Sequence, residues 1–168
     1  MSPCIETRRA RPLLGTFVEI AALTPNEQRL EGTVERGFAA VSQVHRLMSR
    51  HDPMSDLSQL NRGAARRWVK VHRWTAQVLR AAARFSEESK GAFDITLGAG
   101  GSWRDVMVGR DNCIKFRRRL TLDLGGIAKG FAVDRAVAVM RSAGVVSGMV
   151  NAGGDLRVFG REPQPVQI

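Results

Sequence analysis

The stretch LDLGGIAKGFAVD, residues 122–134, predicts a chain that passes from a buried strand through a tight turn into a helix. The strand ends in an acid, the turn is Gly125-Gly126, and the helix carries Lys129. Glycines let backbone N–H groups approach a ligand, a helix N-terminus adds partial positive charge, and a lysine adds a full charge. This layout suits a phosphate. Glycines that only allow tight packing explain the same spacing, which matches neither the P-loop nor the dinucleotide-binding pattern.

Asp123 is the acid at the predicted end of this strand, between two leucines. A carboxylate in an apolar setting carries a desolvation cost that hydrogen bonds, a cation or a ligand must offset. Asp123 is therefore a candidate binding residue.

Strand and helix patterns continue on both sides of this stretch. Residues 14–23 are mostly apolar and β-branched, which predicts a strand. A capping box of Thr24 and Glu27 then starts an amphipathic helix that runs to residue 48. A second amphipathic helix is predicted over residues 74–91.

Shorter elements fill the remainder of the chain. The helix that follows Gly125-Gly126 is predicted to end at Gly144. The other predicted elements are strands at 68–71, 104–108, 112–116, 120–124, 145–150 and 156–159, and a short helix between Ser55 and Asn61. This mixture predicts an α+β fold with a mixed or antiparallel sheet packed against helices, in a single domain over residues 1–168.

Composition excludes two broad classes of protein. Of the 168 residues, 43% are hydrophobic and 25% are charged, which excludes disorder throughout the chain. No apolar run approaches the roughly 20 residues that a membrane-spanning helix needs.

The charge is strongly basic. The net charge is +10, with 26 Lys and Arg residues of which 22 are arginines. Such a charge favours anionic partners, including phosphates, nucleotides, nucleic acid and acidic proteins. An arginine-rich nucleic-acid binder is one hypothesis, but no helix-turn-helix, RRM or zinc-finger pattern supports it, and we expect no specific nucleic-acid site.

Neither the cysteines nor the N-terminus indicates a disulfide framework, a zinc site or a signal peptide. Cys4 and Cys113 lack the companions that a disulfide framework or a zinc site needs. The first residues contain no apolar run typical of a signal peptide, so we expect a cytoplasmic location.

Three other clusters contain polar residues that could bind a ligand. Asp94 lies in GAFDITLG, residues 91–98, where a turn-forming carboxylate is the simpler interpretation. His51 belongs to the segment of residues 48–61, where it lies in a loop between two predicted helices and could stack on a ring or face solvent. In NAGGDLR, residues 151–157, a Gly-Gly hairpin explains the pattern without a ligand.

Taken together and in order, these segments resemble the ApbE-type flavin transferases, the FAD:protein FMN transferase family. The resemblance rests on RPLLGTFVEI, LMSRHDPMSDLSQLNR, GAFDITLGAG, WRDV, LDLGGIAKGFAVDRAV and VNAGGDLRVFG, and runs from about Arg11 to Pro165. It implies an α+β, T-fold-like domain that binds FAD. With Mg²⁺, such a domain transfers FMN to a Thr or Ser hydroxyl of a target flavoprotein and releases AMP.

The resemblance also assigns residues to ligands. His51 occupies a position where many members have an aromatic residue against the flavin ring, and an imidazole offers less surface for stacking. Gly126 occupies the position whose backbone carbonyl binds Mg²⁺. The positions that match FAD contacts are Leu14, His51, Ala92, Phe93, Asp94, Asp123 and Lys129.

The family pattern continues beyond what this sequence contains. Its second half supplies a His-x-Ile-Asp-Pro-like segment and a later Asp and Thr that complete the metal site, and neither occurs here. We therefore expect a domain incomplete at its C-terminus, with the catalytic residues in the missing half. FMN transfer should be near background while flavin binding persists, because phosphoryl transfer depends mainly on charge stabilisation and positioning.

Two further expectations follow. A flavin-binding remnant without transfer activity is the alternative function. Residues 163–168 are apolar enough to form a strand without a partner, and such an exposed sheet edge favours a homodimer or aggregation.

Overall fold

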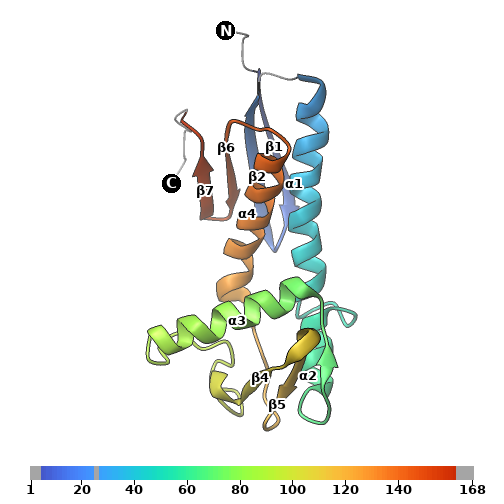
Figure 1. The fold of residues 1–168 in the computed structure, drawn as a ribbon, viewed down its shortest axis with the longest axis vertical. Coiled ribbons are helices and arrows are strands. Elements are labelled where there is room, and N and C mark those ends of the chain that lie inside the picture. The colour runs from blue at the N-terminus through green and yellow to red at the C-terminus, as the bar shows by residue number, and fades with distance from the viewer. Residues whose placement is uncertain (1–4, 25–26, 162–168) are drawn as a thin grey trace. The chain divides into compact units, whose positions relative to one another are not determined.

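The computed structural model describes residues 5–24 and 27–161 (Figure 1). The chain divides into two compact units. Unit 1 is made from residues 1–45 and 129–168, and unit 2 from residues 46–128. The boundary falls inside two helices, α1 (Glu27–Met48) and α4 (Gly125–Ser142).

Unit 1 contains a four-stranded antiparallel sheet in the order β1-β2-β6-β7. The strands are β1 (Ile5–Leu13), β2 (Thr16–Thr24), β6 (Ser147–Ala152) and β7 (Asp155–Phe159). Helix α1 and the unit 1 part of α4 cover one face of this sheet (Figure 1). A Cβ on Gly37 would lie 2.9 Å from Ile20 Cδ1 and 3.5 Å from Met140 Sδ, so this glycine lets α1 pack closely against β2 and α4.

Unit 2 combines two helices with a small antiparallel sheet in the order β3-β5-β4. Its elements are α2 (Asp56–Gly63), β3 (Val69–Lys70), α3 (Arg73–Glu88), β4 (Val106–Val108) and β5 (Cys113–Phe116), with one-turn 3₁₀ helices at Trp103–Asp105 and Arg110–Asn112. Its core contains Leu57, Leu60, Leu79, Ile114, Phe116 and Leu122, each at most 1% exposed.

The predicted α+β class is confirmed, and all four predicted helices are present. Ser55 caps α2, since its hydroxyl accepts the Ser58 N–H at 3.0 Å. Gly153 and Gly154 form the turn between β6 and β7 with φ of 62° and 97°, so the hairpin prediction is also confirmed.

Two features near the N-terminus differ from the sequence-based expectations, and a third expectation stays a prediction. Strand β1 was not predicted, because as an edge strand it has mostly exposed residues and lacks an apolar alternation. The proposed capping residue Thr24 is the last residue of β2, and α1 is described from Glu27. The strand expected at 163–168 lies outside the described residues.

The expectation of a single domain over residues 1–168 stays a prediction. The chain forms two compact units, and helices α1 and α4 each contribute residues to both of them. Cys113 is a free thiol, and Cys4 lies outside the described residues. Within residues 5–24 and 27–161, none of the helices combines the length and apolar character that a membrane crossing requires.

Candidate functional site

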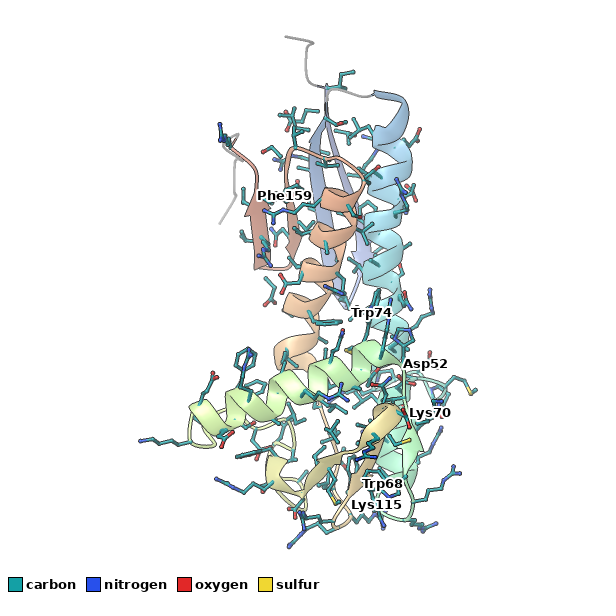
Figure 2. The ribbon with its side chains drawn as sticks, viewed as in Figure 1. Asp52, Trp68, Lys70, Trp74, Lys115 and Phe159 are labelled. Carbon is teal, nitrogen blue, oxygen red and sulfur yellow. The ribbon has the colours of Figure 1, made fainter. Side chains whose placement is uncertain are left out.

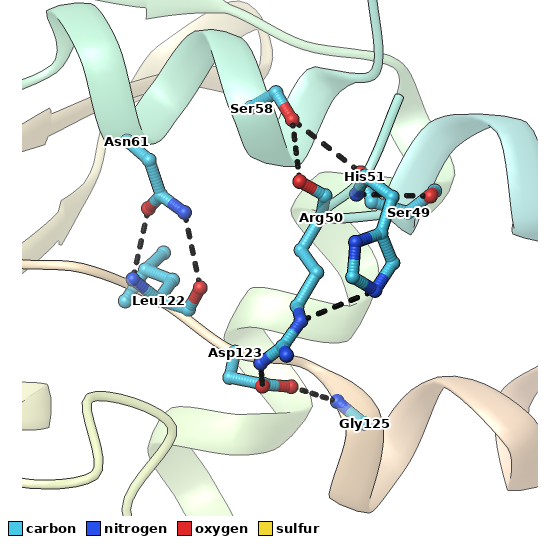
Figure 3. A network of polar contacts seen from close by, with 8 residues as sticks. All are labelled: Ser49, Arg50, His51, Ser58, Asn61, Leu122, Asp123 and Gly125. Carbon is cyan, nitrogen blue, oxygen red and sulfur yellow. Dashed lines mark hydrogen bonds and ion pairs between the residues drawn. The ribbon is translucent and has the colours of Figure 1, made fainter. Parts of the chain in front are cut away.

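The segment before α4 is held by a side chain and not by a neighbouring strand. The amide of Asn61 binds both backbone groups of Leu122: its Oδ1 accepts the Leu122 N–H at 2.8 Å, and its Nδ2 donates to the Leu122 carbonyl at 3.1 Å (Figure 3). The Asp123 N–H donates to the Ile95 carbonyl at 2.8 Å. The strand predicted at 120–124 is therefore wrong, because an amide side chain and a loop take the hydrogen bonds that a strand ladder would make.

Asp123 connects the segment bound by Asn61 to the start of α4. Its Oδ1 accepts the Gly125 N–H at 2.7 Å, and its Oδ2 accepts from Nη1 of Arg50 at 3.0 Å (Figure 3). The carboxylate thus caps the helix and neutralises a guanidinium, which offsets the desolvation of a side chain that is 27% exposed.

His51 is exposed and lies beside the same arginine. Nε of Arg50 donates to Nε2 of His51 at 3.4 Å, so Arg50 is held between the imidazole and the Asp123 carboxylate (Figure 3). The stacking of His51 on a flavin stays a prediction.

The Ala92-Phe93-Asp94 segment is a turn whose carboxylate is used internally. Oδ1 of Asp94 accepts the Thr96 N–H at 2.8 Å, and Oδ2 accepts the Trp103 N–H at 3.2 Å. This geometry confirms the turn-forming role of Asp94.

Phe93 lies next to the first turn of α4. A Cβ on Gly126 would stand 3.4 Å from Cε2 of Phe93, and the Phe93 ring meets Phe85 edge to face with centroids 6.3 Å apart. Ala92 is exposed. Unit 2 therefore brings the phenyl ring of Phe93 to the glycine turn of the sequence motif.

Leu14 occupies a strained turn in unit 1. With φ of +56°, followed by Gly15 at +72°, it forms the two-residue connection between β1 and β2. Its N–H donates to Nδ1 of His45 at 3.1 Å. Both residues line an open hollow of about 460 Å³. A bulky residue in the left-handed region is rare, and strain of this kind concentrates at functional sites.

Lys129 is also in unit 1 and has an acidic neighbour. Its Nζ lies 2.9 Å from Oδ2 of Asp155, the first residue of β7, and both side chains are partly exposed. The lysine is accessible to a phosphate, which would compete with Asp155 for it.

An ion pair between Arg11 and Glu35 links the β1–β2 hairpin, which contains Leu14, to α1. Nη1 of Arg11 donates to Oε2 of Glu35 at 2.9 Å, and Nη2 donates to Oε1. These hydrogen bonds hold the pKa of Glu35 below its ordinary value and raise the pKa of Arg11.

A family model described as the ApbE family matches residues 14–105 and 101–168. The chain belongs to the ApbE family. The resemblance stated from the sequence motifs is thereby confirmed.

Curated ApbE relatives share this similarity at low identity. A protein named FAD:protein FMN transferase from Vibrio cholerae is 25% identical, over 94% of this chain and 56% of that protein. One of the same name from Treponema pallidum is 26% identical, over 92% of this chain and 52% of that protein. The chain thus spans about half the length of the curated relatives it matches.

Solved ApbE structures share the fold. The ApbE protein of Thermotoga maritima superposes with a TM-score of 0.84 and 25% identity, covering 94% of this chain and 60% of that one. The flavinyl transferase ApbE of Pseudomonas stutzeri gives a TM-score of 0.85 at 20% identity, covering 95% and 59%.

Sequence patterns did not single out three residues of this ApbE chain that hydrogen-bond a predicted site residue or its neighbour. They are Arg50, which binds Asp123, Asn61, which binds Leu122, and His45, which binds the Leu14 N–H. Asn61 closes the motif of residues 48–61, and a polar residue at the end of an amphipathic helix was the available signal.

Magnesium has an incomplete set of ligands in the described part of this ApbE chain. Mg²⁺ prefers a near-octahedral shell of oxygens, including carboxylates. Within residues 5–24 and 27–161, no three His, Cys, Asp or Glu side chains gather as a metal site requires. The carboxylate nearest in sequence to Gly126, that of Asp123, already binds Arg50 and the Gly125 N–H. These residues do not fit a Mg²⁺ site by themselves.

The strain at Leu14 gives a stability prediction for this ApbE chain. Leu14→Asn should raise the free energy of unfolding by about 1 kcal/mol, because Asn tolerates positive φ and Asn-Gly is the pair that such turns favour. Urea unfolding measures the change. Leu13→Asn is the control and should destabilise, since Leu13 lies within β1. A Leu14→Asn variant less stable than the parent would contradict the strain argument.

Proposed function

We propose that this chain acts in FAD:protein FMN transfer, with FAD as donor and a target flavoprotein as acceptor. The family match over residues 14–168 carries the proposal. The curated relatives named FAD:protein FMN transferase support it. The arrangement of Phe93, Gly126 and Asp123 around the start of α4 is consistent with it.

Each matched residue has a proposed role toward FAD. Lys129 would bind a phosphate in place of Asp155, and Asp94 and Asp123 would hydrogen-bond the nucleotide. His51 would lie against the flavin ring, with Leu14, Ala92 and Phe93 contributing apolar contacts. These are the roles of the matching positions in the ApbE family.

The proposed reaction exchanges the phosphoanhydride bond of FAD for a phosphodiester. The oxygen of a Thr or Ser hydroxyl attacks the phosphorus of the FMN half of FAD, the bond to the AMP phosphate breaks, and the hydroxyl loses its proton. AMP leaves, and FMN remains attached as a phosphodiester. Catalysis of such a step rests on positioning and on cations that neutralise developing charge, and Lys129 would supply one of these cations.

Mg²⁺ dependence belongs to the proposal through the carbonyl of Gly126. The described residues do not fit the metal by themselves. The same observation favours the second candidate function, a chain that binds flavin and transfers little.

Two assays separate these functions. Titration of the full chain with FAD, followed by flavin fluorescence, should show saturable binding under both hypotheses. In-gel flavin fluorescence of a flavoprotein acceptor, with FAD and Mg²⁺, should then show labelling only if the chain is a transferase. The Vibrio cholerae relative serves as the positive control, and heat-denatured chain as the negative one. Absence of FAD binding by the folded chain would overturn both.

A homodimer through the edge of the unit 1 sheet is a separate proposal. Among the described strands, β7 is the last in the order β1-β2-β6-β7. An uncovered edge is prone to pair with another chain. Sedimentation velocity across a concentration series tests the dimer.

A further inference from the structure

The positive charge of the chain is concentrated in unit 2. Residues 46–128 contain 16 Lys and Arg against 8 Asp and Glu, whereas the residues of unit 1 contain 10 against 8. Unit 2 therefore has a net charge of +8 of the total +10. A field of this sign raises the encounter rate with acidic partners.

Several carboxylates of unit 2 are engaged within it. Asp56 accepts from the His72 N–H and the Thr75 hydroxyl. Asp105 accepts from the Ser102 N–H and from Arg118, and Asp94 and Asp123 are bound as described above. These acids satisfy backbone donors, so they neutralise few of the exposed cations.

The basic strip of unit 2 is defined as Lys70 of β3, Lys115 of β5, and Trp68 and Arg117, which adjoin these strands in sequence. Lys70 pairs with Cys113 in the antiparallel register of β3 and β5. Because side chains alternate along a strand, Trp68 and Lys70 share a face with Lys115. Trp68 directly precedes β3, one position beyond the Val69–Ile114 pair, and Figure 2 labels Trp68 and Lys115 in the part of unit 2 that carries the small sheet.

The indole of Trp68 is anchored and yet open to solvent. A Cβ on Gly109 would stand 2.9 Å from Cζ3 of Trp68, so the ring rests on this glycine, while 45% of the residue is exposed. On the same face, Met107 is paired with Lys115 across β4 and β5 and is partly exposed. The strip thus combines an apolar centre with cations around it.

The cations of the strip have no acidic partner among the described residues. Every Arg and Lys of the strip except the half-buried Lys115 is exposed, and none makes an ion pair with a described carboxylate. Exposed tryptophan and arginine together are typical of protein-binding hot spots, where an aromatic anchor is surrounded by polar contacts.

We propose that the basic strip is a docking surface for an acidic segment of a partner protein, and that this partner is the acceptor of FMN. The second clause rests on the proposed function, since a transferase that modifies a protein must hold that protein. Carboxylates of the acidic segment would bind the cations of the strip, and an apolar residue of the segment would cover Trp68. Charge complementarity selects an acidic segment over a neutral one.

The test measures binding of a fluorescein-labelled peptide to the full chain by anisotropy. The probe is a 12-residue peptide of alternating Asp and Glu with a central Leu, and a peptide with Asn and Gln in place of the acids is the neutral probe. The variant K70E/K115E should weaken binding of the acidic probe by about tenfold or more, because like charges would then face each other.

A matched control reverses the same charge elsewhere in unit 2. Arg73 and Arg80 are exposed on α3, outside the small sheet that carries the strip, and neither pairs with a described carboxylate. R73E/R80E should change binding less than threefold. Equal loss in both double variants would show a general charge effect and overturn the proposal, as would no loss in K70E/K115E or equal binding of the neutral peptide.

Two further arms complete the design. Tighter binding of a single-stranded oligonucleotide than of the acidic peptide, lost in K70E/K115E, would assign the strip to nucleic acid and overturn the proposal. FAD titration should be unchanged in both double variants, which shows that they are folded. Failure of the parent chain to bind FAD counts against the proposed function alone, whereas the peptide result bears on the strip alone.

Discussion

Replacing Asn61 with alanine is expected to lower the free energy of unfolding by about 2–4 kcal/mol. The amide makes two hydrogen bonds to the backbone of Leu122, a residue that is 1% exposed. Alanine leaves that N–H and that carbonyl without partners in an interior where water does not reach them, which is the costly case for a lost hydrogen bond. Urea unfolding monitored by circular dichroism measures the loss.

Gln59→Ala is the matched control for this prediction. Gln59 lies on the same helix and also donates to a backbone carbonyl, that of Met54, at 2.9 Å, but it is exposed. Water replaces its hydrogen bond, so the expected loss is below about 1 kcal/mol. A similar loss in both variants would mean that burial of the Leu122 backbone is not the cause.

Lys129→Ala is expected to weaken FAD binding by about 10- to 100-fold. The change removes a charge-assisted contact to phosphate worth about 1.5–3 kcal/mol, and each 1.4 kcal/mol is a factor of ten in affinity. Asp123→Ala should also weaken FAD binding, since it removes the proposed nucleotide contact and the cap of α4. Flavin fluorescence titration gives both dissociation constants.

Two variants test whether Lys129 acts through its charge on the ligand. Arg157→Ala breaks a comparable exposed ion pair in unit 1, with Asp134, and should leave FAD binding unchanged. Asp155→Asn frees Lys129 from its neighbour and should tighten FAD binding or leave it unchanged. Unchanged affinity in both Lys129→Ala and Asp123→Ala would reject this assignment of the site.

Local signals in the sequence predicted the features that neighbouring residues determine. The cap at Ser55, the Gly153-Gly154 turn and the Asp94 turn each depend on residues within a few positions. Their chemistry is decided before the tertiary fold forms, so a pattern in one chain is enough to predict them.

Contacts between distant residues could not be predicted in this way. Arg50 and Asp123 are 73 positions apart, and Asn61 and Leu122 are 61 apart. The leucines around Asp123 have the composition of a strand, but the partner that binds their backbone is a side chain from α2. Strand β1 illustrates the converse, because pairing with β2 makes a strand of a sequence rich in exposed arginine.

The way unit 1 is assembled from two separate segments has a consequence for folding. Strand β2 pairs with β6, yet the whole of unit 2 lies between them in the sequence. During synthesis the β1–β2 hairpin emerges before β6, so the backbone edge of β2 that pairs with β6 stays open until unit 2 has been completed and β6 has left the ribosome. The entropic cost of closing a loop grows only logarithmically with its length, so the great length of this loop adds little to that cost. It does delay the pairing, so unit 2, a continuous segment, can fold first while the nascent sheet of unit 1 is the species most exposed to aggregation.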